Sequence, residues 1–226
     1  MAKILVYNND SDRFETYYRD ENSAMPYNAN STLLVREFRG SSKSPTLWTT
    51  KRVMQAWNTQ RYLWGGPIPV GFAFKRSWEG GHSGQSQHYA GTAFDVAQLW
   101  TNERRARLRT SAINSGVWSY VEPVSISPTW VHFDRRQKPP SCSSGGYPTL
   151  RRGSLSVYVL ILQDGLNTLG FTTGGLDGIF GNRTFEAVKS YQTSRGLASD
   201  GIVGCNTWRS LQENVIGTGR TSTTLD

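Results

Sequence analysis

Hydrophobic spacing divides the chain into a part of mixed strands and helices and a part of helices alone. Up to about residue 140, short β-branched and aromatic runs alternate with amphipathic segments, whereas from residue 149 apolar positions recur at helical spacing. The pattern predicts strands at 3–7, 66–74, 92–97, 117–121 and 129–133, and helices at 50–63, 101–115, 157–169, 183–195 and 207–213. We therefore expect an α+β fold, with a small, mainly antiparallel sheet flanked by helices and followed by a three-helix domain.

Three segments lack this periodicity. Residues 8–31 are rich in Asn, Asp, Tyr and Ser, so the pattern assigns no role to an N-terminal extension at 1–31. Residues 141–148 are rich in Ser and Gly, which is typical of a linker. Residues 217–226 are rich in Gly and Thr, which predicts a disordered tail. These segments place the first domain at 1–140 and the second at 149–216.

The second domain contains an internal repeat. The sequence DGIFGNRT at 177–184 is matched by DGIVGCNT at 200–207. Each Asp-Gly supplies the backbone angles of a tight turn, and each Gly-x-x-Thr opens a helix. The repeat predicts two similar turn-and-helix units in succession.

The chain is basic, and its charge is unevenly distributed. Its 226 residues carry a formal net charge of +8, with an isoelectric point near 9.7. Residues 1–146 hold 18 Lys and Arg against 11 Asp and Glu, whereas residues 147–226 hold 7 against 6. A basic surface favours a polyanion, such as nucleic acid or an anionic cell wall, and charge alone does not separate the two.

All three histidines fall in two segments that can form one site. His82 and His88 precede Asp95 in a glycine-rich loop that enters a predicted strand, and His132 lies on another predicted strand. Two imidazoles and one carboxylate suit Zn²⁺ better than Ca²⁺ or Mg²⁺, and three ligands leave a fourth position open. We expect His88, Asp95 and His132 to hold one Zn²⁺.

The motif around these residues resembles the zinc D-alanyl-D-alanine peptidases of the M15 family. The match consists of Ser86-x-His88-x-x-Gly91-x-Ala93-x-Asp95 followed by Trp130-Val131-His132-Phe133-Asp134, within a resemblance that covers about residues 32–140. The family includes carboxypeptidases and phage endolysins that cut peptidoglycan stem peptides. The resemblance implies a zinc peptidase domain whose metal ligands are His88, Asp95 and His132.

A substrate-binding cation is also implied by the resemblance. In the family, a basic residue on the strand before the motif binds the substrate carboxylate or steadies the developing oxyanion. Arg76 is at the matching position, and a guanidinium can hold a carboxylate through two parallel hydrogen bonds. Lys75 is the neighbouring alternative.

The general base does not carry over directly from the resemblance. Many relatives have an acidic residue three positions before the last ligand, where this chain has Thr129. Glu122, at the end of the preceding strand, is the first candidate for a catalytic base. Asp134 shares a strand face with His132 and is either a second candidate or an acceptor that orients a ligand. His82 is a lesser candidate.

The second domain closely resembles bacterial peptidoglycan-binding domains, over about residues 150–211. The chain closely follows the family pattern LQxxLNxLG, DGxFGxxT, FQxxxGLxxDGxxG, and both Asp-Gly repeats lie within the match. Together, the two resemblances predict a zinc-dependent peptidase of peptidoglycan stem peptides, either a D-alanyl-D-alanine carboxypeptidase or an endolysin-type endopeptidase. Two alternatives are an L-Ala-D-Glu endopeptidase and a non-catalytic, metal-containing wall-binding protein.

The sequence also gives expectations about where the chain is located and what it binds. The N-terminal Met-Ala-Lys is followed by only four apolar residues, and no run approaches the length of a membrane span. We expect a chain that is made in the cytoplasm and reaches the wall after phage or mother-cell lysis. Its expected partner is bacterial peptidoglycan, with no nucleic acid or membrane, and the chain is expected to be a monomer.

Overall fold

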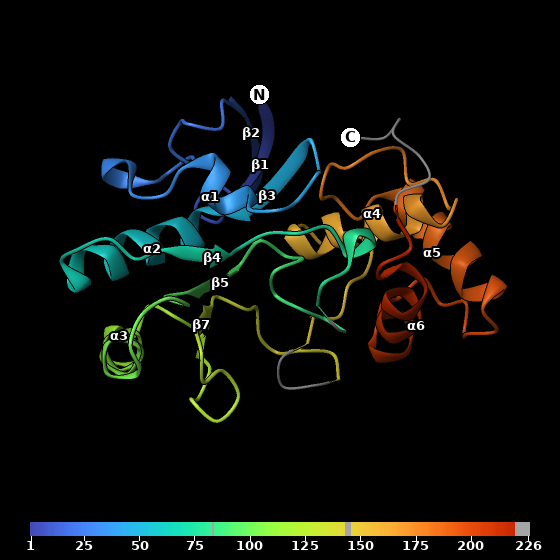
Figure 1. The fold of residues 1–226 in the computed structure, drawn as a ribbon. Coiled ribbons are helices and arrows are strands. Elements are labelled where there is room, and N and C mark those ends of the chain that lie inside the picture. Colours follow the sequence, from blue (N-terminus) through green and yellow to red (C-terminus); the bar gives the residue numbers. More distant parts are fainter. Residues whose placement is uncertain (83, 143–145, 220–226) are drawn as a thin grey trace.

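The computed structural model describes residues 1–82, 84–142 and 146–219 and has a mixed α+β fold (Figure 1). The helices are α1 (Val35–Arg39), α2 (Lys51–Trp64), α3 (Asn102–Ser115), α4 (Val157–Thr168), α5 (Asn182–Ser194) and α6 (Cys205–Val215). The strands are β1 (Ala2–Asn8), β2 (Arg13–Arg19), β3 (Thr46–Thr50), β4 (Val70–Phe72), β5 (Ala93–Val96), β6 (Tyr120–Val121) and β7 (Val131–Asp134), and the short 3₁₀ segments are η1 (Ala29–Ser31) and η2 (Ser77–Glu79).

The N-terminal segment, to which the pattern assigned no role, forms most of a separate sheet. β1 pairs antiparallel with β2 and parallel with β3, giving the order β2-β1-β3. The expectation of one sheet was therefore incomplete. β2 and β3 were missed because β2 is an exposed edge strand without an apolar face, and β3 is buried throughout. Neither strand shows the alternation by which a half-buried strand is recognised.

The second sheet is antiparallel, as expected, and has the order β4-β5-β7-β6. In its centre Phe94 lies opposite Phe133, and both rings are fully buried. Trp118 stacks on Phe133 with ring centroids 4.3 Å apart, and Trp57 of α2 lies 4.7 Å from Phe94. Since side chains alternate along a strand, the residues between these aromatics face the other way, toward the candidate site.

The two longer N-terminal helices have local start and stop signals. The Thr50 hydroxyl accepts a hydrogen bond from the Val53 amide at the start of α2, and the Thr101 hydroxyl caps α3 in the same manner. Both helices end at a glycine in the left-handed conformation. These signals account for the agreement between the predicted and observed bounds of both helices.

The two turn-and-helix units predicted in the C-terminal half have the same pattern of hydrogen bonds. The Gln163 amide nitrogen donates to Asp177 Oδ1 at 2.7 Å and to Thr184 Oγ1 at 3.2 Å. In the second unit the corresponding donor is Gln192, which bonds Asp200 Oδ1 at 2.9 Å and Thr207 Oγ1 at 3.1 Å. The glycine after each aspartate has a positive φ and donates its amide to the same glutamine. A buried glutamine on one helix thus fixes the turn that starts the next.

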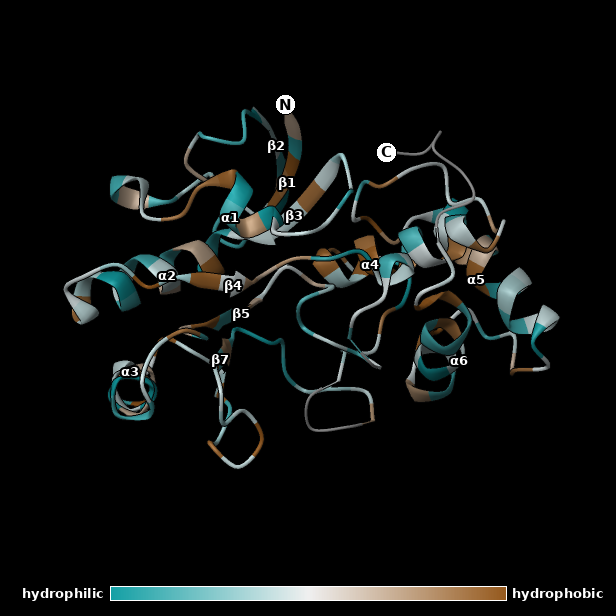
Figure 2. Cartoon of the chain, in the orientation of Figure 1, coloured by the Kyte–Doolittle hydropathy of each residue, from teal (hydrophilic) through white to brown (hydrophobic). Residues whose placement is uncertain are grey.

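The two halves share one hydrophobic core, and α4 lies between them (Figure 1). Hydrophobic residues occur along α4 (Figure 2), and its first eleven residues are buried. The Tyr158 hydroxyl donates to Gln87 Oε1 at 2.8 Å, and the Tyr147 hydroxyl donates to the Ser86 carbonyl at 2.8 Å. The predicted linker, which includes residues 143–145 outside the described ranges, thus contains an interface residue, Tyr147.

The end of the described chain also contacts the first half. The amides of Gly217 and Gly219 donate to the carbonyls of Ser77 and Trp78 in η2. Residues 217–219 of the predicted tail are therefore hydrogen-bonded, and the remainder of that prediction, 220–226, lies outside the described residues. No helix in the described ranges has both the length and the apolar character needed to cross a membrane.

A buried ion pair joins η2 to α4. Arg76 Nε lies 2.7 Å from Asp164 Oδ2, and the second guanidinium nitrogen reaches the other carboxylate oxygen. Both side chains are almost inaccessible, at 0% and 4% exposure. The Arg76 guanidinium also donates to Ser44 Oγ at 2.7 Å and lies over the Trp48 ring. Because both charges are out of water, each depends on the other.

We predict that Asp164→Asn lowers the free energy of unfolding by about 3–5 kcal/mol, since it removes the charge of the carboxylate that both Nε and a terminal nitrogen of the buried Arg76 guanidinium contact. The matched control is Glu21→Gln, which removes the carboxylate of the more exposed Arg39–Glu21 pair and should cost less than about 1 kcal/mol. Denaturant titration of the full chain measures both values. Equal losses for the two variants would contradict a dependence of the interface on this pair.

Candidate metal centre

The polar face of the β5–β7 pair brings together the three residues predicted as metal ligands. Asp95 lies directly opposite His132 in the strand register, and the loop before β5 places His88 beside them. Asp95 Oδ1 is 2.7 Å from His132 Nδ1, and Asp95 Oδ2 is 3.2 Å from His88 Nε2. The carboxylate thus lies between two imidazoles that are 44 positions apart in the chain.

His88 has a fixed orientation and one unsatisfied nitrogen. Its Nδ1 lies 3.0 Å from the Ala73 carbonyl, an acceptor, so Nδ1 carries the proton of the neutral ring. Its Nε2 is buried, has no hydrogen-bond partner within the described residues, and presents a lone pair toward the carboxylate of Asp95. A cation between these two atoms would satisfy both, and a neutral Nε2 is the form in which histidine binds Zn²⁺.

Two carboxylates determine the charge of His132 when no cation is bound. Burial by itself lowers the pKa of His132, but hydrogen bonding to Asp134 and Asp95 outweighs burial and raises the pKa from 6.5 to about 9. Burial by itself raises the pKa of Asp95, but the hydrogen bond from the His132 imidazolium holds it below its usual range. The metal-free site therefore contains an imidazolium beside a carboxylate, and a cation would displace that proton.

His82, a lesser candidate for the base, also reaches the site, where it is a candidate ligand that the sequence reasoning did not assign. One ligand atom each from His82, His88 and Asp95 lie within 4.8 Å of one another. The rings of His82 and His88 stack with centroids 4.5 Å apart, and Phe72 of β4 contacts both rings. Burial, followed by the nearby His88, lowers the pKa of His82 to about 4, which keeps it neutral at pH 7. Among the described residues, His82, His88 and Asp95 form the three-residue group whose ligand atoms lie this close together, whereas the predicted ligand His132 contacts Asp95 but is not part of that group.

Arg76 does not lie in the site, contrary to the interpretation of the sequence. Its side chain is fully buried and bound to Asp164, so it cannot meet a substrate in this structure. The adjacent Lys75 lies on the site side: its ammonium group is 5.9 Å from the centre of the Phe72 ring, and its charge contributes to the low pKa of His82. Adjacent side chains on an extended segment point in opposite directions, so Lys75 lies on the side of the site while Arg76 is buried.

The carboxylates considered as bases have different environments. Asp134 is fully buried and its oxygens accept from Arg136 Nε at 2.8 and 3.0 Å, in addition to contacting His132 Nε2 at 3.2 Å. Burial by itself raises the pKa of Asp134, but Arg136 and His132 outweigh burial and lower it. An ionised carboxylate with these contacts orients His132, as the second interpretation of Asp134 proposed.

Glu122 remains a candidate for the base on the strength of its register. Its amide donates to the His132 carbonyl at 2.9 Å, which continues the β6–β7 ladder and sets Glu122 opposite His132. Opposed residues on antiparallel strands share a face, and Glu122 is partly exposed there. Thr129 occupies the position that is usually acidic in the family. It is exposed and lines a cavity beside α3.

Comparison with known proteins identifies part of the C-terminal half. Residues 157–211 match the family described as "Putative peptidoglycan binding domain". The match covers α4, α5 and most of α6, with both Asp-Gly turns. The resemblance found in the sequence repeat is therefore supported for this region.

Curated relatives are similar over a limited length. The chain is 55% identical over 53 residues to the N-acetylmuramoyl-L-alanine amidase CwlM of Mycobacterium tuberculosis, covering 24% of this chain and 13% of that protein. It is 39% identical over 62 residues to a spore cortex-lytic enzyme of Bacillus cereus, covering 27% and 24%. It is 42% identical over 77 residues to an uncharacterized protein of Kitasatospora aureofaciens, covering 32% and 65%. The chain thus spans between about an eighth and two thirds of these relatives.

We predict that metal-free protein loses the stabilising contribution of His132 as pH rises. Because the pKa of His132 is raised by folding from 6.5 to about 9, this contribution is complete below about 6.5 and disappears as pH passes about 9. With chelator present, the stability advantage of the native chain over His132→Asn, on the order of 3 kcal/mol at most, should fall between pH 6 and 10.

His82→Asn is the matched control for this pH series. The pKa of His82 is about 4, so His82 stays neutral across the series and the effect of its replacement should not vary with pH. Thermal or denaturant unfolding at each pH measures both differences. A His132→Asn difference that is constant from pH 6 to 10 would contradict the proposed imidazolium.

Proposed function

We propose that this chain is a zinc-dependent peptidase that cleaves peptidoglycan stem peptides and is anchored to the cell wall by its C-terminal helices. The observation that carries the proposal is the buried Nε2 of His88, unpartnered in the described ranges and 3.2 Å from Asp95 Oδ2, beside His132 on the same sheet face. These are the three residues that match the M15 motif. Similarity of residues 157–211 to peptidoglycan-binding domains supports the same substrate.

Zinc fits the donor set better than a hard cation does. Two imidazole nitrogens and one carboxylate oxygen from His88, His132 and Asp95 are its preferred ligands. The Ala73 carbonyl fixes the His88 ring, and Asp134 contacts the His132 ring, so both imidazoles are held by groups outside the ligand set. Zinc bound there would act as a Lewis acid toward the scissile carbonyl and lower the pKa of water.

The chain's own residues would supply the proton transfer and charge stabilisation. Glu122, opposite His132 and partly exposed, is the proposed base that accepts a proton from the attacking water and returns it to the leaving amine. Lys75 replaces Arg76 as the cation that holds a substrate carboxylate or the developing oxyanion. Asp134, fixed by Arg136, orients His132 throughout.

The general class of cell-wall hydrolase and the more specific class of zinc peptidase are supported by different observations. The named activities of the relatives, an amidase and a cortex-lytic enzyme, together with the C-terminal match, favour a cell-wall hydrolase. The zinc peptidase class rests on the site and on the M15 motif. Cleavage of D-alanyl-D-alanine, cleavage of L-Ala-D-Glu and binding without catalysis differ in whether peptide is cleaved and in the mass of the products.

We predict that His132→Ala abolishes zinc binding and that His82→Ala retains it, because the M15-like set contains His132. The native chain should bind about one zinc ion, measured by elemental analysis after dialysis, and His88→Ala or Asp95→Ala should bind almost none. His82→Ala is the matched control, since its ring belongs to the same cluster. If His82→Ala loses zinc while His132→Ala keeps it, the ligand set is His82, His88 and Asp95 instead.

We predict that Glu122→Gln lowers kcat on purified muropeptides by about 10²–10⁴-fold without loss of zinc, as expected for a general base. Mass spectrometry of the products measures turnover and also identifies the bond: loss of one D-alanine indicates a carboxypeptidase, and a split stem indicates an endopeptidase. Arg107→Gln, on the exposed face of α3, is the control for a surface change. Zinc binding by the native chain without turnover would favour the non-catalytic alternative.

A further inference from the structure

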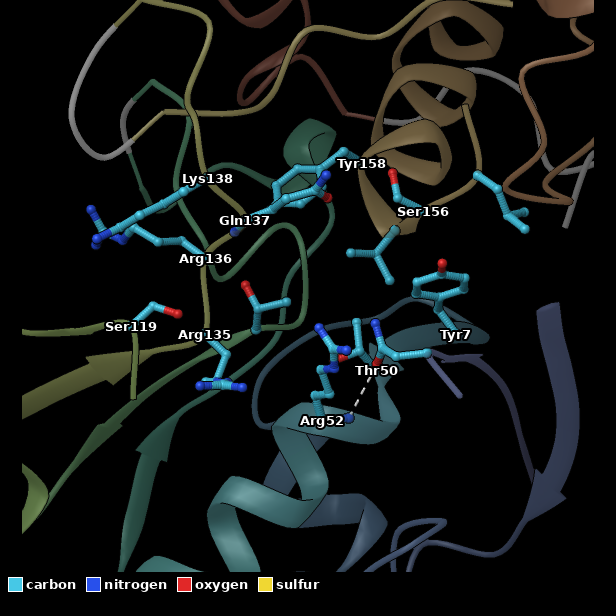
Figure 3. Close-up of a pocket in the computed structure, with 14 residues that line it drawn as sticks. Tyr7, Thr50, Arg52, Ser119, Arg135, Arg136, Gln137, Lys138, Ser156 and Tyr158 are labelled. Atoms are coloured by element: carbon cyan, nitrogen blue, oxygen red, sulfur yellow. Dashed lines mark hydrogen bonds between the residues drawn. The ribbon is translucent and has the colours of Figure 1, made fainter. Parts of the chain in front are cut away.

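A cleft lies between elements that are distant in the sequence (Figure 3). It has a volume of about 460 Å³. Its walls come from the ends of β1 and β3, from the segment after β7 and from the start of α4. The cleft therefore exists only because the C-terminal helices pack against both sheets.

The cleft is basic. Four of its lining side chains are cationic, namely Arg52, Arg135, Arg136 and Lys138, and none of the described residues that line it is acidic. Arg136 is paired with Asp134, but among the described residues no ion pair involves Arg52, Arg135 or Lys138. Figure 3 shows Arg52 and Arg135 entering from different elements, α2 and the end of β7. Three cations thus line one cleft without a counter-charge among the described residues.

Like charges in the cleft act on one another. Burial, followed by the proximity of Arg52, lowers the pKa of Arg135. Two guanidinium groups that repel each other in a partly buried cleft are stabilised when an oxyanion lies between them. The start of α4 adds to this potential: Ser156 makes no side-chain cap, and Ser156, Val157 and Tyr158 line the cleft at the positive end of a 12-residue helix.

The cleft is connected to the metal centre through one side chain. Arg136 lines the cleft and binds Asp134, which contacts His132. In the proposed function, an anion bound by Arg52 and Arg135 would therefore belong to the same substrate chain as the bond that the centre cleaves. The open, polar shape suits an extended peptide with free carboxylates better than a compact ion.

We propose that this basic cleft binds a carboxylate of the peptide substrate away from the scissile bond, with Arg52 and Arg135 as the binding residues and Lys138 at the rim. The inference rests on the proposed function for the identity of the substrate and goes beyond it in assigning a second binding site. Two guanidinium forks reaching one carboxylate supply directional hydrogen bonds, and these fix the direction in which the peptide crosses the site.

The test measures binding in the absence of turnover. Zinc-free protein, full length, is titrated calorimetrically with a soluble stem tetrapeptide that has free carboxylates, and with the same peptide amidated at its carboxylates. The double variant Arg52→Gln/Arg135→Gln should bind the free-carboxylate peptide at least tenfold more weakly than the native chain, and the amidated peptide should bind both proteins equally weakly. Arg107→Gln is the matched loss of one positive charge far from the cleft and should bind like the native chain.

The outcomes separate this inference from the proposed function. Equal affinity of the native chain and the double variant for the free-carboxylate peptide would overturn the cleft assignment, even if zinc-dependent turnover is intact. Charge-dependent binding in a chain without peptidase activity would support the cleft and contradict the peptidase. A phosphodiester polymer that binds in an Arg52- and Arg135-dependent manner, where the peptide does not, would also overturn the assignment. Unchanged thermal unfolding of the double variant confirms that it folds.

Discussion

Antiparallel pairing between β5 and β7 sets Asp95 opposite His132, and much of the remaining arrangement follows from that register. One position along, Phe94 and Phe133 meet on the other face and enter the aromatic core. A slip of one residue would place both aromatic rings in the polar cleft and both ionisable groups in the core. Since burying such groups without partners costs several kcal/mol, the hydrophobic face fixes the geometry of the polar face.

Buried charge then determines which polar side chains are available for chemistry. Asp134 is satisfied by Arg136, and Arg76 is satisfied by Asp164, so neither is free to react with a substrate. His88 is the exception, since its Nε2 is buried beside the Asp95 carboxylate without a hydrogen-bond partner in the part of the chain that the structure describes. Among these groups, His88 Nε2 is the atom that a ligand from outside the chain would satisfy.

In the proposed function, packing of α4 against the first half changes how wall binding and cleavage are related. A flexible tether raises the local concentration of an enzyme on an insoluble polymer and leaves its orientation open. Here Tyr147, Tyr158 and the Arg76–Asp164 pair hold the C-terminal helices against η2 and the loop that carries His88. In the proposed function, this contact also fixes the direction from which the polymer reaches the metal centre, and it forms one wall of the basic cleft.

The sequence by itself determined the elements with local signals and predicted the three candidate ligand positions. Helices α2 to α6 lie within two residues of their predicted bounds, because caps, glycine stops and helical periodicity act over a few positions. The Asp-Gly repeat and the clustering of His88, Asp95 and His132 were visible in the same way. Tertiary structure alone decided the rest: it paired the exposed strand β2, brought His82 to the cluster, and gave Arg76 a partner 88 positions away. The physical reason is that the free energy of a charge or an edge strand depends on contacts distant in sequence, which no local pattern records.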